Sequence, residues 1–439
     1  MQLGVRGAEL SDRRAIPVPA LPHTIEDTGL EPGFLGDLLI KTTYRTGLER
    51  PSEMARALKL PSWIVDQLIE NAKAKKLMEA LGQLGASMAA EMRYTLTAKG
   101  KEFAVEALAL SDWTGAAPVP LEHYVRQLTA QSILGEVLTR PRLERVFKEL
   151  TLSEMLMEQV GPAVNSGASM LLYGPPGNGK SSIAVAVCAA FQDHIFLPYA
   201  IEVDKQVITL FDPAVHARMD REGEEGSGLR REGGFDPRYV RCKRPIVITG
   251  GELTLDMLDL AYNPVSRVYE APMQMKASGG ILVVDDFGRQ RQSPQELINR
   301  LIIPLENKLD YLSLQTGRKF EAPFDALVIF STNIAPKQLV DDAALRRLRY
   351  KILVDKPDRD TYIRIFAKTA AKFDLRLDEE TLAFILVDLY GKTPGAEFHA
   401  FHPKFLIEQT LAICSYEGVE RQLTAEYLRR AWRNLFTEH

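Results

Sequence analysis

The sequence predicts an α/β fold, in which a parallel β-sheet is flanked by helices, with an all-helical region at the C-terminus. Two apolar runs, Gly280–Val284 and Ala326–Thr332, are rich in β-favouring residues, and polar side chains follow each of them. Such runs are typical of strands buried on both faces of a parallel sheet. A third run, Met170–Tyr173, leads through a glycine-rich loop into an Ala- and Val-rich helix at Ile183–Phe191. Buried strands that alternate with helices indicate the α/β class.

The composition is that of a water-soluble protein with more than one domain. A chain of 439 residues is too long for one ordinary core, so we expect two or three domains. The net charge of −4 gives no general attraction to nucleic acid or to an anionic membrane. Three separated cysteines predict neither a disulfide framework nor a zinc site, and no apolar stretch is long enough for a membrane span. We therefore expect a cytoplasmic protein with no membrane partner.

Composition and periodicity divide the chain into five segments. We expect an irregular tail, a compact unit of helices and strands, a helical linker that includes Leu121–Leu138, an α/β core, and a bundle of four helices. These segments cover, in that order, residues 1–32, 33–110, 111–160, 161–355 and 356–439. The four helices are expected at 358–373, 378–391, 403–417 and 424–436, with N-caps at Asp358, Asp378 and Thr424.

The second segment resembles a winged-helix domain of the kind found in bacterial transcription regulators. Three helices and two strands are expected at Phe34–Tyr44, Pro51–Leu58, Pro61–Lys75, Leu77–Leu81 and Met92–Leu96, and the wing closes with the pattern Y-x-L-T-x-x-G. In that family the third helix usually enters the DNA major groove. Residues 33–110 hold eleven Lys and Arg against nine Asp and Glu, and Asp66 and Glu70 lie on the polar side of the third helix. This weak charge leaves both DNA binding and protein docking open.

The glycine-rich loop fits the phosphate-binding template G-x-x-x-x-G-K-[ST] in the strand–loop–helix context that the template requires. Its backbone N–H groups and the helix N-terminus favour phosphate oxygens. Lys180 can reach the β- and γ-phosphates of ATP, and the Ser181 hydroxyl can bind Mg²⁺. The predicted nucleotide-binding residues are Gly174, Pro175, Pro176, Gly177, Asn178, Gly179, Lys180, Ser181 and Ser182.

Polar residues follow the two other buried strands. Because ligands bind at the carboxyl ends of parallel strands, we expect these residues to face the phosphate loop. Asp285 would hold Mg²⁺ together with Ser181, and Asp286 would activate the attacking water as a general base. Asn333 would hold that water or the γ-phosphate. The cluster Arg346, Arg347 and Arg349 is either solvated or supplies arginine fingers to a neighbouring subunit.

Together these motifs give residues 161–439 a resemblance to the AAA+ ATPases. The phosphate loop corresponds to Walker A, Ile281–Asp286 to Walker B, Asn333 to sensor 1, and the helical region to the lid. The resemblance implies a homo-oligomeric ring, usually a hexamer, with ATP and Mg²⁺ at each subunit interface. Arg347 matches the finger position best, and Arg346 is its close rival. Lys404 matches the place of a sensor-2 arginine, with lysine in place of arginine.

The sequence departs from the family pattern in two ways. Walker B usually ends in Asp-Glu, whereas this chain has Asp-Asp, a pair found in some helicase loaders. The 105 positions between Lys180 and Asp285 exceed a minimal core. We assign the excess to an insert that includes a glycine-rich, mobile loop at Asp220–Gly234 and the apolar run Pro245–Glu252; such inserts commonly line the pore of a ring ATPase.

A β-hairpin is expected between the helix Ser293–Lys308 and sensor 1. Its strands, Asp310–Gln315 and Phe320–Ala322, flank a Gly turn. The hairpin resembles the pre-sensor-1 hairpin of the branch that includes MoxR-type chaperones, enhancer-binding activators and replicative helicases. We therefore expect an ATP-hydrolysing ring motor that remodels a protein or protein–DNA target. The alternatives are a DNA-binding nucleotide switch and a helicase or translocase that grips DNA through Lys319.

Overall fold

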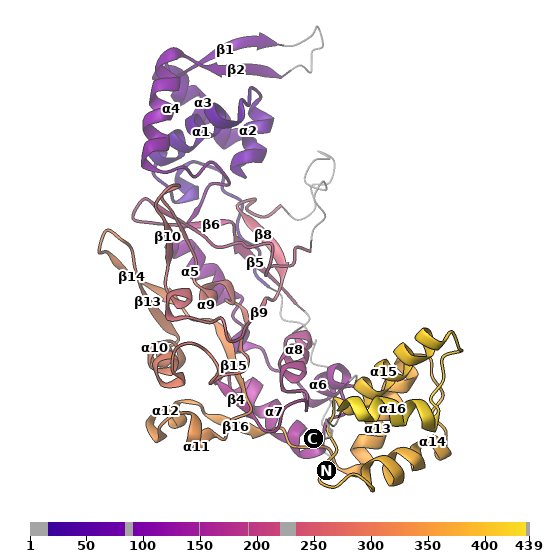
Figure 1. Ribbon diagram of the computed structural model, residues 1–439. Coiled ribbons are helices and arrows are strands. Elements are labelled where there is room, and N and C mark those ends of the chain that lie inside the picture. The colour runs from indigo at the N-terminus through magenta and orange to yellow at the C-terminus, as the bar shows by residue number, and fades with distance from the viewer. Residues whose placement is uncertain (1–15, 84–90, 149, 192, 220–233, 436–439) are drawn as a thin grey trace, which may run out of the picture.

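The computed structural model describes residues 16–83, 91–148, 150–191, 193–219 and 234–435 (Figure 1). The expected mobile loop Asp220–Gly234 lies outside these residues except for Gly234. So do residues 1–15 of the expected tail. No helix of the described part is both long and apolar enough to cross a membrane.

The central sheet has five parallel strands, as the α/β class predicts. Their order is β16 (Tyr350–Leu353), β4 (Met170–Tyr173), β15 (Ala326–Thr332), β12 (Gly280–Val284) and β9 (Ile246–Thr249). Every residue of β12 and β15 is buried, which confirms the interpretation of their apolar runs. The assignment of Pro245–Glu252 to an insert was wrong, because β9 is the edge strand of this sheet. Its main-chain pairing with β12 could not be inferred from local pattern.

Helices cover both faces of the central sheet. On one face α6 (Arg140–Phe147), α7 (Glu154–Asn165) and α8 (Lys180–Ala190) pack against alternate residues of the strands. On the other face lie α10 (Pro294–Asn307), α11 (Pro336–Leu339) and α12 (Asp342–Arg347). Helix α10 confirms the expected helix between Ser293 and Lys308, and Ser293 caps its N-terminus. The predicted boundary between residues 160 and 161 falls inside α7.

Two further sheets, built of short strands, lie between the central sheet and the N-terminal unit (Figure 1). One has five strands in the order β10 (Ala261–Asn263), β11 (Val268–Glu270), β7 (Gln206–Thr209), β6 (Ala200–Val203) and β3 (Val119–Pro120). The other pairs β5 (His194–Pro198) with β8 (Tyr239–Lys243). Helix α5 (Leu121–Ala130) packs on both. We call these seven strands and α5 the adaptor unit.

Of the adaptor unit, β3 and α5 fall in the predicted helical linker 111–160, and the other six strands fall in the predicted core 161–355. The expected helix Leu121–Leu138 ends at Ala130, and a short 3₁₀ turn at Ile133–Gly135 follows. A 3₁₀ turn at Leu255–Leu258 and the short helix α9 (Met273–Lys276) complete this region. Strands of two to five residues from distant parts of the chain build the adaptor sheets, so local sequence gives little sign of them.

The N-terminal unit contains the expected three helices and two strands. These are α1 (Pro32–Thr46), α2 (Pro51–Leu58), α3 (Ser62–Ala74), β1 (Met78–Gln83) and β2 (Met92–Leu96). A fourth helix, α4 (Ala98–Leu110), was not predicted. Thr97 Oγ1 accepts a hydrogen bond from Gly100 N at 3.0 Å and so caps α4. A Cβ at Gly100 would lie 2.0 Å from Leu77 O, so only glycine permits this close approach.

The hairpin and the C-terminal helices also follow the prediction. Strands β13 (Leu309–Ser313) and β14 (Lys319–Pro323) pair antiparallel. The lid consists of α13 (Arg359–Lys372), α14 (Glu379–Ala383) continued by a π-helix at Phe384–Tyr390, α15 (His402–Glu417) and α16 (Ala425–Leu435). The predicted caps Asp358, Asp378 and Thr424 accept hydrogen bonds from backbone N–H groups three residues later.

Candidate functional site

The phosphate loop joins β4 to α8 through glycines with left-handed backbone. The φ angles of Gly174, Gly177 and Gly179 are 137°, 74° and 89°, a region that other residues rarely adopt. A Cβ at Gly174 would lie 2.4 Å from Val354 O of the neighbouring segment. Gly179 is the N-cap of α8, so the free N–H groups of the first helical turn lie at the loop.

The Lys180 side chain lies within the phosphate loop and reaches the next strand. Only 7% of Lys180 is exposed. Its Nζ donates hydrogen bonds to Gly174 O at 3.0 Å, to Pro175 O at 2.9 Å and to Asn333 Oδ1 at 2.6 Å. Burial lowers the pKa of Lys180, and the nearby carboxylates of Asp285 and Asp286 oppose this shift. The structure therefore brings the predicted lysine and the predicted sensor asparagine into contact.

Ser181 and Asp285 form the second contact between the loop and the strands. Ser181 Oγ donates a hydrogen bond to Asp285 Oδ2 at 2.7 Å. A hydroxyl and a carboxylate are hard oxygen donors, and Mg²⁺ bound to nucleotide phosphates needs only one or two such protein ligands. The pair therefore fits a Mg²⁺ ion that is shared with phosphates.

Asp286 lies at a sharp turn after β12. Its φ angle is 47°, and its side chain is exposed. The Gln290 Nε2 atom donates hydrogen bonds to Asp285 O and Gly250 O, both at 3.1 Å. Gln290 thus fixes the turn that carries both carboxylates. The sequence reasoning missed this residue, and a glutamine four positions after Asp286 gives no specific signal.

A cavity of about 430 Å³ joins these groups at the carboxyl edge of the central sheet. Its walls are Pro176, Gly177, Gly179, Lys180, Ser181, Ser182, Asp285, Asp286, Arg289, Ser331 and Asn333. Nine of these eleven residues were predicted, and Arg289 and Ser331 were not. Arg289 is exposed and follows Asp286 by three positions, so it adds a positive charge beside the carboxylates. Gly174, Pro175 and Asn178 belong to the loop but do not line the cavity.

The predicted arginine fingers lie outside this cavity. Arg346 and Arg347 end α12, and Arg346 is exposed. Arg347 is half-buried, its Nε lies 3.0 Å from Glu306 Oε1, and its Nη1 donates to Ala343 O at 2.9 Å. The structure thus holds Arg347 in place and leaves Arg346 to solvent.

Lys404 is not brought to the cavity. Its side chain is 67% exposed and its Nζ lies 3.7 Å from Glu408 Oε1. The lid instead meets the phosphate loop through a segment just before α15. Ala400 N donates to Asn178 Oδ1 at 3.0 Å, and His399 Nδ1 lies 3.3 Å from Pro176 O. Sequence reasoning missed this contact because it joins segments more than 200 residues apart.

Comparisons with known proteins give one family match and distant structural similarities. A family model described as a domain of unknown function (DUF8689) matches residues 358–434, which form the lid. Among curated proteins, no sequence matches the chain. A crystal structure of NtrX from Brucella abortus is similar, with a TM-score of 0.38 and 13% identity over 86% of this chain and 63% of that one. This chain thus spans less than two thirds of the NtrX chain.

A second solved structure with similarity is the Holliday junction branch migration motor RuvB of Thermotoga maritima. The TM-score is 0.35 and the identity is 14%, over 67% of this chain and 70% of the RuvB chain.

Proposed function

We propose that the chain is an AAA+-type ATPase that hydrolyses ATP to ADP and phosphate and uses the energy to remodel a protein or protein–DNA target. One observation carries this proposal. Lys180, the Ser181–Asp285 pair and Asn333 meet in one cavity at the carboxyl ends of adjacent parallel strands. These are the side chains that phosphoryl transfer needs for binding phosphates, for holding a metal ion and for placing water.

Each side chain has a part in the proposed reaction. Lys180 binds the β- and γ-phosphates and offsets their charge, and Ser181 and Asp285 hold Mg²⁺. The bound ion supplies further neutralisation of phosphate charge. Asp286 takes the proton of the attacking water, and Asn333 orients that water against the γ-phosphate. Because aspartate is one methylene shorter than glutamate, Asp286 needs a closer water or a bridging one.

The proposal extends to a homo-oligomeric ring, of the hexameric kind that the resemblance implies. Arg346 and Arg347 lie outside the cavity of their own chain, so they would act only on the nucleotide of a neighbouring copy. There a guanidinium would stabilise charge on the γ-phosphate in the transition state. The ion pair with Glu306 supports Arg347 as the positioned member of the two.

The N-terminal unit is proposed to recruit the target as a winged-helix-type module. Its third helix, α3, exposes Trp63, Asp66 and Glu70. The Asp66 carboxylate opposes a DNA phosphate backbone, Glu70 is paired with Lys73 Nζ at 2.8 Å, and an exposed aromatic ring suits a protein surface. These side chains favour a protein target over DNA.

The enzymatic part is tested by steady-state phosphate release from ATP with Mg²⁺. We expect Lys180→Ala to lower the rate by at least about 100-fold, because one positioned charge in such a site is worth several kcal/mol. Lys337→Ala, an exposed lysine on α11, is the matched control and should keep the wild-type rate. Wild-type turnover in Lys180→Ala would refute the ATPase.

A DNA-binding nucleotide switch with negligible turnover is the second candidate, and the exposed, short Asp286 is the observation that favours it. ATP-gated binding of duplex DNA without hydrolysis would support this candidate. Turnover that duplex DNA does not change would support the protein remodeller. A helicase or translocase is the third candidate, because Lys319 is exposed at the hairpin. Absence of strand unwinding and of nucleic-acid affinity at low salt would remove it.

A further inference from the structure

The β13–β14 hairpin is part of a buried core and does not project alone. Leu312, Leu314, Phe320 and Ala322 are at most 8% exposed. They share one hydrophobic cluster with α5 and with strands of the adaptor unit, including Tyr124, Leu128, Ile208 and Tyr269. Moving the hairpin away from the adaptor unit would expose this apolar surface to water, which is costly.

The tip of the hairpin is also attached to the adaptor sheet. Gln315 N donates a hydrogen bond to the Tyr269 hydroxyl at 2.9 Å. Arg318 Nη1 lies 3.2 Å from Oδ1 of Asp204, which sits in the turn between β6 and β7. This exposed ion pair adds little stability, but it marks where the hairpin tip meets the adaptor sheet.

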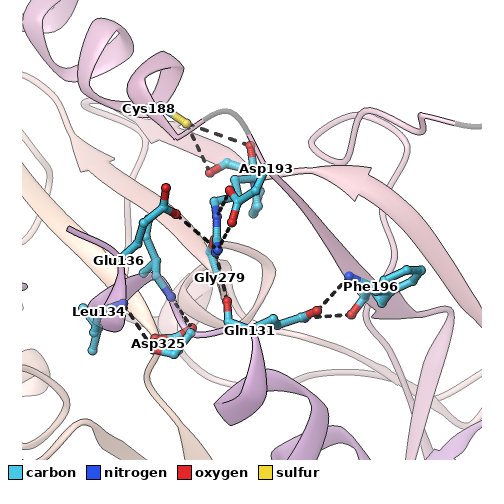
Figure 2. A network of polar contacts seen from close by, with 12 residues as sticks. Gln131, Leu134, Glu136, Cys188, Asp193, Phe196, Gly279 and Asp325 are labelled. Carbon is cyan, nitrogen blue, oxygen red and sulfur yellow. Dashed lines mark hydrogen bonds and ion pairs between the residues drawn. The ribbon is translucent and has the colours of Figure 1, made fainter. Parts of the chain in front are cut away.

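A buried polar network joins the adaptor unit to the starts of the two strands that carry the site (Figure 2). The Arg244 side chain is 2% exposed, and Nε and Nη2 each donate to Asp193 at 2.6 Å. Its Nη1 donates to Gln131 O at 3.1 Å and to Gly279 O at 2.6 Å. Gly279 immediately precedes β12, whose far end carries Asp285.

The second strand is held in the same network. Asp325, which precedes β15, accepts hydrogen bonds from Ser132 Oγ at 2.6 Å and from Ile133 N at 3.3 Å. Gln131 exchanges two hydrogen bonds of 2.9 Å with the Phe196 backbone in β5, as Figure 2 shows. Buried charges with several hydrogen bonds resist rearrangement, because breaking one partner leaves an uncompensated charge. The strand that ends near Asn333 is therefore also tied to the adaptor unit.

The opposite side of the adaptor unit holds the N-terminal unit. Phe34 and Trp113 pack against one hydrophobic cluster of the adaptor sheet. Asp112 N donates to Ser266 O at 2.9 Å. Arg238, which is 1% exposed, donates through Nη1 to Thr28 O at 2.9 Å.

We infer that the hairpin and the adaptor unit move as one body, which transmits the nucleotide state of the site to the N-terminal unit. The inference rests on the proposed ATPase. Strands β12 and β15 run from the site to the buried polar network. That network and the hydrophobic core of the hairpin both contact the adaptor unit, and the N-terminal unit packs on the adaptor sheet. A hairpin that swings by itself to grip a substrate would have to leave its buried core. The hairpin together with the adaptor unit thus couples the nucleotide site to the N-terminal unit.

A reversible cross-link tests whether the hairpin moves relative to the adaptor unit. The double variant Asp204→Cys/Arg318→Cys is joined with a short bismaleimide that contains a cleavable disulfide; the three native cysteines are buried. We expect ATP turnover within twofold of the uncross-linked protein. A tenfold loss that reductant restores would overturn the inference. A Ser313→Cys/Lys319→Cys link within the hairpin, where these residues are cross-strand partners, is the control for labelling.

Hydrogen exchange tests the transmission itself. We expect amides of residues 112–117 to exchange at different rates with ATPγS and with ADP, and we expect this difference to disappear in Leu314→Ala. A thermal melt and the ATPase rate show that Leu314→Ala is folded, and a milder Leu314→Val replaces it if it is not. Equal exchange with both nucleotides in the wild type, or a difference that persists in folded Leu314→Ala, would overturn the inference. Absence of turnover in the wild type would instead speak against the proposed ATPase.

Discussion

Lys180 Nζ and Asn333 Oδ1 lie 2.6 Å apart and join the phosphate loop to the end of β15. The amide oxygen accepts from the ammonium, so Asn333 orients Lys180 as well as facing the cavity. The same side chain would hold the attacking water in the proposed reaction.

The first prediction concerns Asn333. We expect Asn333→Ala to lower kcat for ATP by about 100-fold, the size typical for loss of one positioned group, with a smaller change in nucleotide affinity. The measurement is phosphate release together with a titration of fluorescent ATP. Gln338→Ala, an exposed amide on α11, is the control. An unchanged kcat in Asn333→Ala would remove Asn333 from the proposed mechanism.

The second prediction concerns Mg²⁺ and the 2.7 Å contact between Ser181 and Asp285. Ser181→Ala removes one oxygen ligand and leaves the carboxylate. We expect the Mg²⁺ concentration for half-maximal ATPase activity to rise by about tenfold or more, since loss of one ligand interaction costs at least about 1.4 kcal/mol. Ser182→Ala, the adjacent hydroxyl at the cavity, tests whether the effect is specific. Equal Mg²⁺ dependence in Ser181→Ala and wild type would contradict the metal assignment.

The sequence predicted the site better than it predicted the surroundings of the site. Lys180, Asp285 and Asn333 stand in short patterns whose strand context is local, and carboxyl ends of parallel strands must meet at one edge. The adaptor sheet depends on pairings such as Val119 with Ile201, which join short strands from distant segments. Periodicity over a few residues cannot reveal such partners.

Two further features escaped prediction, for different reasons. Helix α4 was missed although Thr97 is a favourable N-cap and residues 98–110 are rich in the helix formers Ala, Lys, Glu and Leu, because the Thr-x-x-Gly pattern was assigned to the end of the wing alone. Lys404 was expected to reach the nucleotide from the lid, whereas the lid meets the phosphate loop through His399 and Ala400. Only the second of these outcomes depends on a tertiary contact between distant segments.

The third prediction concerns packing of the lid on the phosphate loop. Gly177 has a φ angle of 74°, and a Cβ there would lie 2.2 Å from Phe401 Cδ1. We expect Gly177→Ala to weaken ATP binding by about tenfold or more, because left-handed backbone costs an alanine about 1–2 kcal/mol and the lid must also shift. Fluorescent-nucleotide titration measures the change.

Removing the Phe401 ring tests whether its clash with residue 177 causes the loss of ATP affinity. In Gly177→Ala/Phe401→Ala the steric conflict is gone while the backbone cost remains, so we expect affinity to recover in part. Phe401 is the N-cap of α15, and Tyr416 is a 90% exposed aromatic residue near the C-terminal end of that helix. Tyr416→Ala in combination with Gly177→Ala should therefore give no recovery of affinity. A double variant no better than Gly177→Ala would show that the lid contact is not responsible.

The last prediction concerns the stability of the lid as a function of pH. His402 is 4% exposed, and its Nδ1 lies 2.6 Å from the Tyr390 hydroxyl. Burial, and to a lesser degree the neighbouring His399, lowers the pKa of His402 to about 4. The unfolded chain, with an ordinary histidine pKa near 6.5, therefore binds a proton that the folded lid excludes. Stability is present in full above about pH 6.5 and falls as the pH drops toward 4.

The size of this loss of stability follows from the lowered pKa of His402. Between pH 7.5 and pH 5 this histidine lowers the free energy of unfolding by up to about 2 kcal/mol. Below the unfolded pKa and above the folded pKa, each pH unit costs about 1.4 kcal/mol. His402→Gln keeps a polar side chain that can hydrogen-bond to the Tyr390 hydroxyl and does not titrate, so its urea midpoint should fall less than that of the wild type over this interval. His216, whose pKa burial also lowers, remains in both proteins and cancels in the comparison. Equal shifts of the two midpoints would show that His402 is not the group that links folding of the lid to pH.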